Sequence, residues 1–329
     1  MCGGRERQWQ LLLDIFTPEL FASAVRFATP IGLAAAGAAI CERSGVVNIA
    51  LEGLMLLGAF FGVMVTLLVG NIWLGVLAAV TAGLVASALH AWAAINLRAD
   101  QIVSGTAINL FALGLTGFLM EAVFGQFGST DSVPQTIQPV FDFPTGGSGL
   151  LGTIWTWIDV VFLSYTPLVY VGIFASIGLT WALFRTRWGL RVRALGEHPR
   201  AADTVGVSVL RGRWVAVLIS GLMAGLAGAN LTLEQVGSFT ENMTNGRGFI
   251  ALAANIFGRW IPGGAYLASL LFGFAQALQL KLQLFSDKIR IPSQFFSMLP
   301  YVLTVLVLAG VMGRAIGPKA VGKPYKEKS

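Results

Sequence analysis

Long apolar segments follow one another along most of this chain, and they restrict its possible folds more than any other feature. About 20 apolar residues are needed to cross the roughly 30 Å hydrocarbon core of a bilayer. Segments that reach or approach this length lie at 20–40, 46–69, 72–95, 102–124, 164–184, 214–231, 265–280 and 296–313. Because lipid offers no partners to backbone polar groups, such segments must form helices. We therefore predict an all-α polytopic membrane protein.

The charge content excludes a soluble globular domain. Charged residues make up 12% of the 329-residue chain, against about 25% in soluble proteins. The net charge of +6 would suggest nucleic-acid binding in a soluble protein. Here the basic residues gather in two places, 185–213 and 314–328. This pattern is typical of membrane-protein loops held in the cytoplasm, and it argues against a nucleic-acid partner.

Residues 249–257 are apolar but too short to cross a bilayer alone, and the sequence Gly-Arg-Trp-Ile-Pro-Gly-Gly follows them. We predict a broken or re-entrant helix near 249–264, covered by protein. Counting it as a crossing gives about nine spans, within a range of eight to ten. This count places both basic regions, and so the C-terminus, in the cytoplasm. It places 125–163, which has no Lys or Arg, outside.

The predicted organisation is a single membrane domain. An N-terminal segment, 1–19, precedes the domain at 20–313, and a basic tail, 314–329, follows it. The composition of the tail predicts a disordered, solvated segment. The glycines at 221, 225 and 228 form a small-residue stripe, which predicts close helix packing.

The cytoplasmic loop 185–213 contains seven arginines and the sequence GEHPRAADTVGV. Pro199 suits the first turn of a short helix, because its fixed φ and missing N–H cost nothing there. Ala201 and Ala202 would follow on a small face that another protein can contact. We predict a helix that a transporter offers to a cytoplasmic motor. The arginines would also meet anionic lipid headgroups.

Polar residues within the spans are the candidates for a translocation path. Asn48 and Glu52 are four residues apart, so we expect them to share a helical face. The pair either lines or gates the path, or it forms an interhelical hydrogen bond that locks two spans. Asn109, Asn255 and Gln276 are further candidates, with the same alternative. We expect His90 to be a packing residue.

The sequence lacks the signatures of an enzyme. The two histidines and two cysteines form no metal-ligand pattern, and no nucleophile elbow is present. Residues 317–324, GPKAVGKP, nearly match a phosphate-binding loop, but Pro replaces the final Ser or Thr and no strand precedes them. We expect no cofactor in this chain and no ATP hydrolysis by it.

Three segments resemble a known family: ERSGVVNIALEGLMLLGAF at 42–60, ALGEHPRAADTVGV at 194–207 and GRGFIALAANIFGRWIPGGAYLASLLFG at 246–273. Together they resemble the permease subunits of bacterial ABC importers of the branched-chain amino acid and simple-sugar class, in particular the nucleoside-uptake branch. The resemblance implies that 20–313 is a permease domain in a bacterial cytoplasmic (inner) membrane. It also implies transport driven by cytoplasmic ATPase subunits, which would hold ATP and Mg²⁺. It also implies a second similar permease, making a heterodimer, and an extracytoplasmic substrate-binding protein. The residues that match the coupling helix of that family are Gly196, Glu197, Pro199, Ala201, Ala202 and Gly206.

Several alternatives stay open at this point. The solute is a nucleoside, or else a simple sugar or branched-chain amino acid carried by the same class of permease. A self-sufficient secondary transporter would suit the broken helix, although few buried carboxylates are available for coupling to ions. A membrane enzyme would require a cluster of titratable residues at one membrane face, which the sequence does not show.

Overall fold

The protein is built from helices, as a computed structural model of the chain shows. The described residues are 15–141, 150–284, 293–299 and 316–326, with positions 302, 305 and 306, and they contain no β-strand. The long helices are α2 (Pro18–Arg43), α3 (Leu51–Val69), α4 (Ile72–Ala91), α5 (Gln101–Phe124), α7 (Pro167–Arg185), α10 (Val209–Ala229) and α12 (Pro262–Leu284). The short ones are η1 (Trp92–Asn96), α6 (Leu150–Ile158), η2 (Asp159–Leu163), α8 (Arg187–Glu197), α9 (Pro199–Thr204), η3 (Asn230–Val236), α11 (Arg247–Phe257) and α14 (Ser293–Ser297).

Seven helical stretches in the described part of the chain are long and apolar enough to cross a membrane. They confirm the prediction of an all-α polytopic membrane protein. The eighth predicted span, 296–313, lies mostly outside the described residues. The segment predicted to be broken contains α11, which has 11 residues and is followed by the turn 258–261 and then α12. The break is therefore confirmed.

Local sequence signals set the ends of these helices. The side chains of Asn71 and Asp100 accept hydrogen bonds from the first backbone N–H groups of α4 and α5, which removes unpaired donors at each N-terminus. Gly70 and Gly125 end α3 and α5 in the left-handed conformation, where glycine carries no steric penalty.

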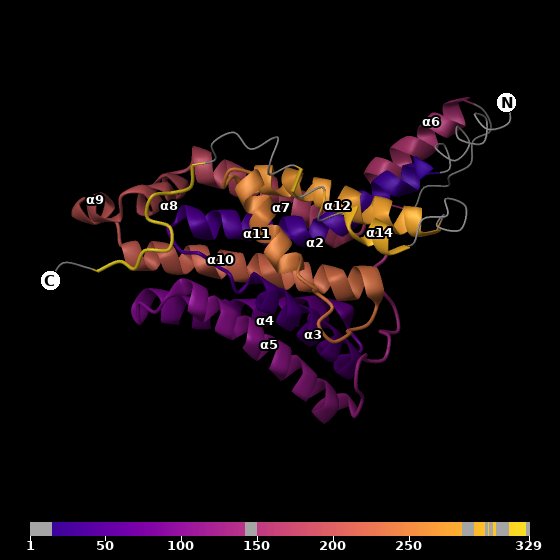
Figure 1. Ribbon diagram of the computed structural model, residues 1–329, viewed down its shortest axis with the longest axis horizontal. Coiled ribbons are helices and arrows are strands. Elements are labelled where there is room, and N and C mark those ends of the chain that lie inside the picture. Colours follow the sequence, from indigo (N-terminus) through magenta and orange to yellow (C-terminus); the bar gives the residue numbers. More distant parts are fainter. Residues whose placement is uncertain are drawn as a thin grey trace.

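The long helices form two groups joined by α10. Figure 1 shows α2, α7 and α12 together on one side and α3, α4 and α5 on the other. α10 packs against α2 in the first group and against α3 and α4 in the second. α2, α3 and α10 are largely buried, whereas α5 is mostly exposed. The exposed apolar faces of the outer helices are the surfaces available to lipid or to a partner subunit.

The glycine stripe of α10 allows this close packing. A Cβ atom at Gly228 would lie 2.3 Å from the carbonyl oxygen of Met55 on α3, and one at Gly225 would lie 2.5 Å from that of Ala79 on α4. Neither approach is compatible with a side chain. The prediction that the stripe serves helix packing is confirmed.

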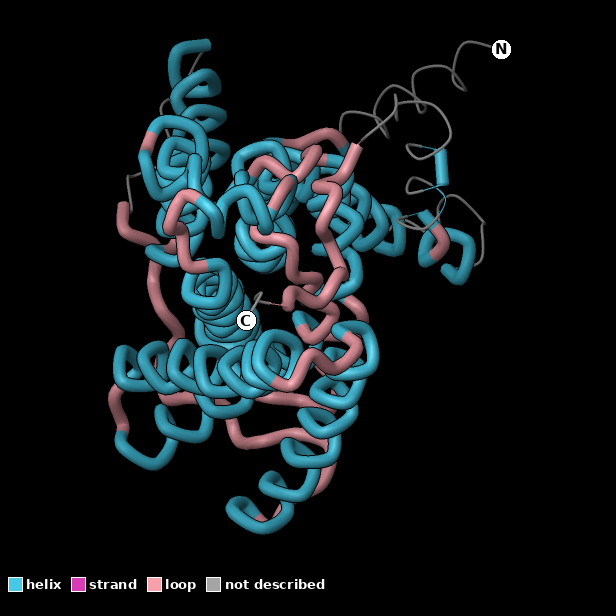
Figure 2. The backbone as a smooth tube through the Cα atoms, turned by 90° about the vertical axis from the view of Figure 1, so that its left-hand side faces the viewer, coloured by secondary structure: helices cyan, strands magenta, loops and turns pink. Residues whose placement is uncertain are grey.

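The helices run roughly along the long axis of the molecule, which gives it two distinct ends (Figure 1). One, the α9 end, carries α8, α9 and the C-terminal segment. The opposite end carries α6 and the start of α2. Figure 2 shows the backbone seen from the α9 end, where the described C-terminal segment ends near the centre of the outline.

Candidate functional site

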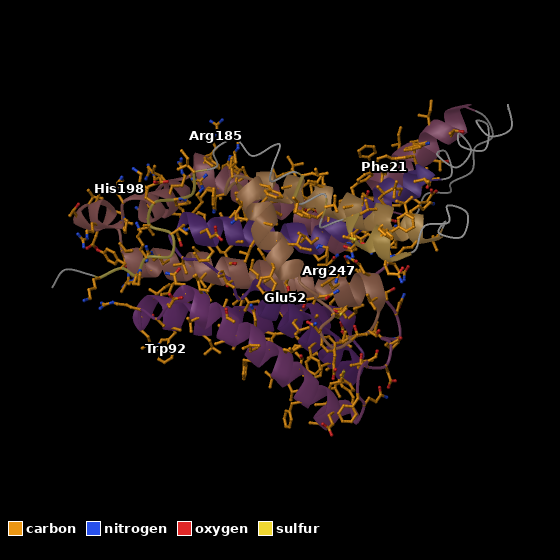
Figure 3. All side chains as sticks on the ribbon, in the orientation of Figure 1. Phe21, Glu52, Trp92, Arg185, His198 and Arg247 are labelled. Carbon is orange, nitrogen blue, oxygen red and sulfur yellow. The ribbon has the colours of Figure 1, made fainter. Side chains whose placement is uncertain are left out.

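The arginine-rich loop between α7 and α10 folds into two short helices. The first, α8, continues from Thr186, whose hydroxyl accepts a hydrogen bond from the N–H of Gly189. Pro199 lies in the first turn of the second, α9, as the sequence predicts. His198 joins the two helices near the tip of the α9 end (Figure 3).

The two alanines of α9 differ in their exposure to solvent. Ala201 is exposed, whereas Ala202 is 4% exposed and packs with Leu195, Val209 and Tyr325. The expectation that both alanines form one contact face is therefore wrong: residues 201 and 202 are about 100° apart around a helix. The exposed surface instead includes Arg200 and the side chain of Val205, which is 77% exposed. Sequence reasoning missed Val205, although an apolar residue just after a predicted docking helix was a visible signal.

Gly196 and Gly206 have separate structural reasons for being glycine. A Cβ atom at Gly196 would lie 2.2 Å from the carbonyl oxygen of Arg43, so this position lets α8 touch the end of α2. Gly206 has φ of +81°, a conformation that favours glycine. It follows the last turn of α9 and directs the chain back toward α10. Glu197 is half-buried beside the groove described below.

The end of α2 also holds the break between α11 and α12. Arg259 and Trp260 have φ of +56° and +55°, which is unusual for residues other than glycine. Arg43 donates hydrogen bonds to both of their carbonyl oxygens, at 3.0 and 2.9 Å. The indole N–H of Trp260 donates to the carboxylate of Glu42. These contacts fix a strained turn directly beside α8.

The described C-terminal segment, 316–326, lies against the same region. Tyr325 is 7% exposed, and its hydroxyl donates to the carboxylate of Asp203 on α9 at 2.7 Å. Lys323 accepts a hydrogen bond from Arg213 through its carbonyl oxygen. The expectation of a disordered, solvated tail is wrong for these residues. Composition alone does not reveal that backbone groups of the tail find partners on α8 and α10.

A basic groove of about 800 Å³ is lined by the C-terminal segment on one side and by α9 on the other. It is lined by Arg98, Glu197, His198, Pro199, Arg200, Ala201, Arg213, Lys319, Ala320, Lys323, Pro324, Tyr325 and Lys326. Three of the six predicted coupling residues, Glu197, Pro199 and Ala201, therefore line it. The remaining three, Gly196, Ala202 and Gly206, shape the loop.

Glu52 does not share a helical face with Asn48. Residues 46–48 are not helical and α3 begins at Leu51, so the predicted helical span 46–69 is wrong over its first residues. Glu52 accepts hydrogen bonds from the backbone N–H groups of Gly246 and Gly248, at 2.8 and 2.7 Å. It therefore caps the N-terminus of α11, and Figure 3 shows it near Arg247 at the centre of the molecule.

Asn48 and Asn109 also hold backbone segments together. Asn48 is fully buried and donates to the hydroxyl of Ser220 on α10 at 3.0 Å. Asn109, on α5, donates to the carbonyl oxygen of Ile49 and accepts from the N–H of Gly53. Both amides thus support the non-helical entry to α3. Of the two interpretations of the Asn48 and Glu52 pair, these contacts favour the structural one.

The remaining predicted path residues lie elsewhere. Asn255 is fully buried on α11. Within the described residues, its side-chain nitrogen and oxygen form no hydrogen bond of standard distance and angle. Gln276 is half-buried on α12. The structure therefore brings Asn48, Glu52 and Asn109 to one region around the start of α3 but leaves Gln276 apart. His90 bonds the hydroxyl of Ser104 and the carbonyl oxygen of Val47, which confirms its packing role.

A polar pocket of about 340 Å³ opens at the opposite end. It is lined by Ser23, Arg26, Phe27, Thr136, Ile137, Gln138, Pro139, Thr166, Val169, Asn230, Glu234 and Gln235. The last three belong to the π-helical segment η3, and π-helical turns are frequent at functional sites. Sequence analysis missed these residues, although Asn, Glu and Gln at the end of an apolar span were a signal. Among the described residues, no cluster of His, Cys, Asp and Glu could hold a metal ion.

Comparison with known proteins agrees with this arrangement. The family model described as branched-chain amino acid transport system / permease component matches residues 20–308. The chain belongs to this family. It is 44% identical to the guanosine ABC transporter permease protein NupQ of Bacillus subtilis, over 95% of this chain and 97% of the relative. It is 39% identical to the nucleoside ABC transporter permease protein NupC of Lactococcus lactis, over 93% and 96%.

A third relative shows that solute names vary among similar permeases. The putative glucose ABC transporter permease protein TsgC13 of Haloferax volcanii is 37% identical, over 82% of this chain and 79% of that protein. The membership covers the whole membrane domain of the permease, including α9 and the α11 break.

Proposed function

We propose that this permease carries nucleosides into the cell as a membrane subunit of an ABC importer. The two relatives that match more than nine-tenths of the chain are named for guanosine and for nucleosides. Family membership makes the chain a translocation subunit. ATP and Mg²⁺ would bind to separate ATPase subunits, and a substrate-binding protein would deliver the solute outside the membrane.

The single observation that carries this proposal is α9. It is a short helix at the far end of the molecule, connected to α7 through α8 and to α10 through residues 205–208. Arg200, Ala201 and the adjacent Val205 are exposed. Such a helix can transmit force only if another protein binds it. We assign Gly196, Glu197, Pro199, Ala201, Ala202 and Gly206 to this coupling loop, either as contact residues or as residues that shape it.

We propose that the α9 end lies in the cytoplasm of a bacterium, in its cytoplasmic membrane. The loop 185–213 and the C-terminal segment are rich in Arg and Lys, and both lie at this end (Figure 1). Basic loops are retained on the cytoplasmic side. The opposite end, with the polar pocket, would then face the substrate-binding protein.

We propose a second, similar but different permease as the partner across the translocation path, and lipid around the remaining surface. The path residues predicted from sequence then fall into two groups. Glu52, Asn48 and Asn109 hold the start of α3 and α11 in place, so they control the shape of the path. Asn255 and Gln276 stay as candidates for direct contact with the solute.

The test is uptake by the complete complex, reconstituted in vesicles with its ATPase subunits and binding protein. A panel of labelled nucleosides, glucose and branched-chain amino acids is offered with and without ATP. ATP-dependent uptake confined to nucleosides is expected. Uptake confined to glucose or amino acids would replace the proposed solute, and uptake by this chain alone without ATP would indicate a secondary transporter.

A further inference from the structure

We propose that the C-terminal segment 316–326 forms, together with α9, one docking surface for the ATPase subunit, and that the basic groove between them receives an acidic segment of that subunit. This inference rests on the proposed function, because it assumes an ATPase partner. It adds a component that the short coupling helix does not include.

The C-terminal segment is anchored at several points along its length. The N–H of Ala320 donates to the carbonyl oxygen of Gly196, and the N–H of Gly322 donates to that of Gly45. Arg213 of α10 donates to the carbonyl oxygen of Lys323 at 3.0 Å. The segment therefore binds the end of α8, the end of α2 and the start of α10 at the same time. It is a fixed part of the α9 end.

The segment also positions α9. A six-residue helix is too short to be stable by itself, since isolated helices need about 12–15 residues. The hydroxyl of Tyr325 donates to the carboxylate of Asp203 in the last turn of α9, and the ring packs with Ala202. Any force applied to α9 is therefore shared with the C-terminal segment.

The groove between the two carries a strong positive charge. Its lining includes Arg98, Arg200, Arg213, Lys319, Lys323 and Lys326, but only one carboxylate, that of Glu197. Except for the buried Arg213, these basic side chains are exposed. Glu197 also interacts with the charge of Arg43, which reduces its effect on the groove. A concave basic surface attracts an acidic partner and speeds its association.

The position of the groove favours a protein over a lipid headgroup. Seen from the α9 end, the described C-terminal segment ends near the centre of the outline, with helices around it (Figure 2). Lipids surround the outer helices along the sides of the molecule. A groove on the end surface faces the water, where a peripheral subunit binds. The occupant that fits is a protein segment with several Asp or Glu side chains.

The test reverses two groove charges, Lys319→Glu together with Lys323→Glu, in the complete complex. The matched control is Arg187→Glu together with Arg191→Glu, which makes the same charge change at exposed α8 positions outside the groove. Binding of the purified ATPase subunit to the permease in nanodiscs is measured over a range of salt concentrations. We expect the groove variant to bind at least about tenfold more weakly and with a smaller salt dependence. We expect the control to change binding by less than about threefold.

Three outcomes would overturn the inference while leaving the proposed function intact. In the first, the groove variant binds the ATPase as tightly as the unchanged permease. In the second, groove and control variants weaken binding equally, which would show a general charge effect. In the third, the groove variant loses only its response to anionic phosphatidylglycerol in the nanodisc, which would assign the groove to lipid. Failure of nucleoside uptake by the unchanged complex would instead overturn the proposed function.

Discussion

Glu52 shows how a carboxylate can be placed inside a membrane protein for structural reasons. Its two oxygens accept the N–H groups of Gly246 and Gly248, which α11 leaves unpaired at its N-terminus. The partial positive charge of that terminus also favours a carboxylate. A Cβ atom at Gly248 would lie 2.4 Å from the backbone nitrogen of Glu52. The N-terminus of α11 therefore needs both the carboxylate of Glu52 and a glycine at position 248.

Replacing Glu52 with Ala would leave the buried N–H group of Gly248 and the partly buried N–H group of Gly246 without partners. Each unpaired buried group costs about 1–3 kcal/mol, so we expect a clearly lower unfolding temperature and impaired uptake. Glu52→Gln keeps one acceptor oxygen, so its unfolding temperature and uptake should lie between those of Glu52→Ala and the unchanged permease. The measurement is thermal unfolding of the purified complex in detergent, together with vesicle uptake. An unchanged unfolding temperature for Glu52→Ala would show that the two hydrogen bonds do not stabilise α11.

Arg259 provides a second test at the scale of one residue. Its left-handed backbone costs about 1–2 kcal/mol for a residue with a side chain, and the side chain itself is exposed. Arg259→Gly should therefore raise the unfolding temperature, whereas Arg259→Val should lower it, because a β-branched residue tolerates this conformation poorly. Equal unfolding temperatures for the two variants would contradict the strain at this turn.

At the scale of elements, α9 depends on its neighbours for its position. Its buried face contacts Leu195, Val209 and Tyr325, and its exposed face is free for another protein. The adjacent residues Ala201 and Ala202 separate these two roles. This pair offers a matched test of docking against folding.

We expect Ala201→Trp to leave the unfolding temperature within about a degree of the unchanged permease, since the site is exposed. It should reduce the coupling of ATP hydrolysis to uptake by tenfold or more, because the indole would block the contact with the ATPase. Ala202→Trp should instead destabilise the α9 end, since no space exists there. The measurements are thermal unfolding and the number of ATP molecules hydrolysed per nucleoside carried. Normal coupling in Ala201→Trp would contradict a docking role for this face.

Short helices and breaks concentrate where the long helices end. The end of α2 contacts both the turn 258–261 and the end of α8. Arg43 contacts the turn, and its carbonyl oxygen lies against Gly196. Movement of α8 would therefore reach α11 through the end of α2. This connection would give the loop 185–213 a physical route to α11.

At the scale of the whole molecule, the charge distribution predicts its orientation. Basic side chains gather at the α9 end, so this end should stay in the cytoplasm. A cysteine introduced at Arg200 should react with a membrane-impermeant maleimide only after the membrane is opened. One introduced at Phe127, which is 74% exposed near the opposite end, should react in intact cells. Cys2→Ser provides the background, because the remaining Cys41 is buried. Labelling of position 200 in intact cells would invert the proposed orientation.

Hydrophobicity and charge by themselves determined the class of this protein, the seven spans found in its described part and the broken helix. Each of these follows from local composition, since a bilayer selects helices by length and loops by charge. The motif around Pro199 likewise predicted α9, because proline restricts the first turn whatever surrounds it.

Only the tertiary structure decided which groups meet. It placed the carboxylate of Glu52 against the N-terminus of α11, buried Ala202 but not Ala201, and packed the C-terminal segment against α9. The contacts of Glu52 and of the C-terminal segment depend on partners 110 or more residues away in the sequence, as for Arg213 and Lys323. Local composition does not predict such partners, because the packing of whole helices determines which groups come close enough to form a buried hydrogen bond.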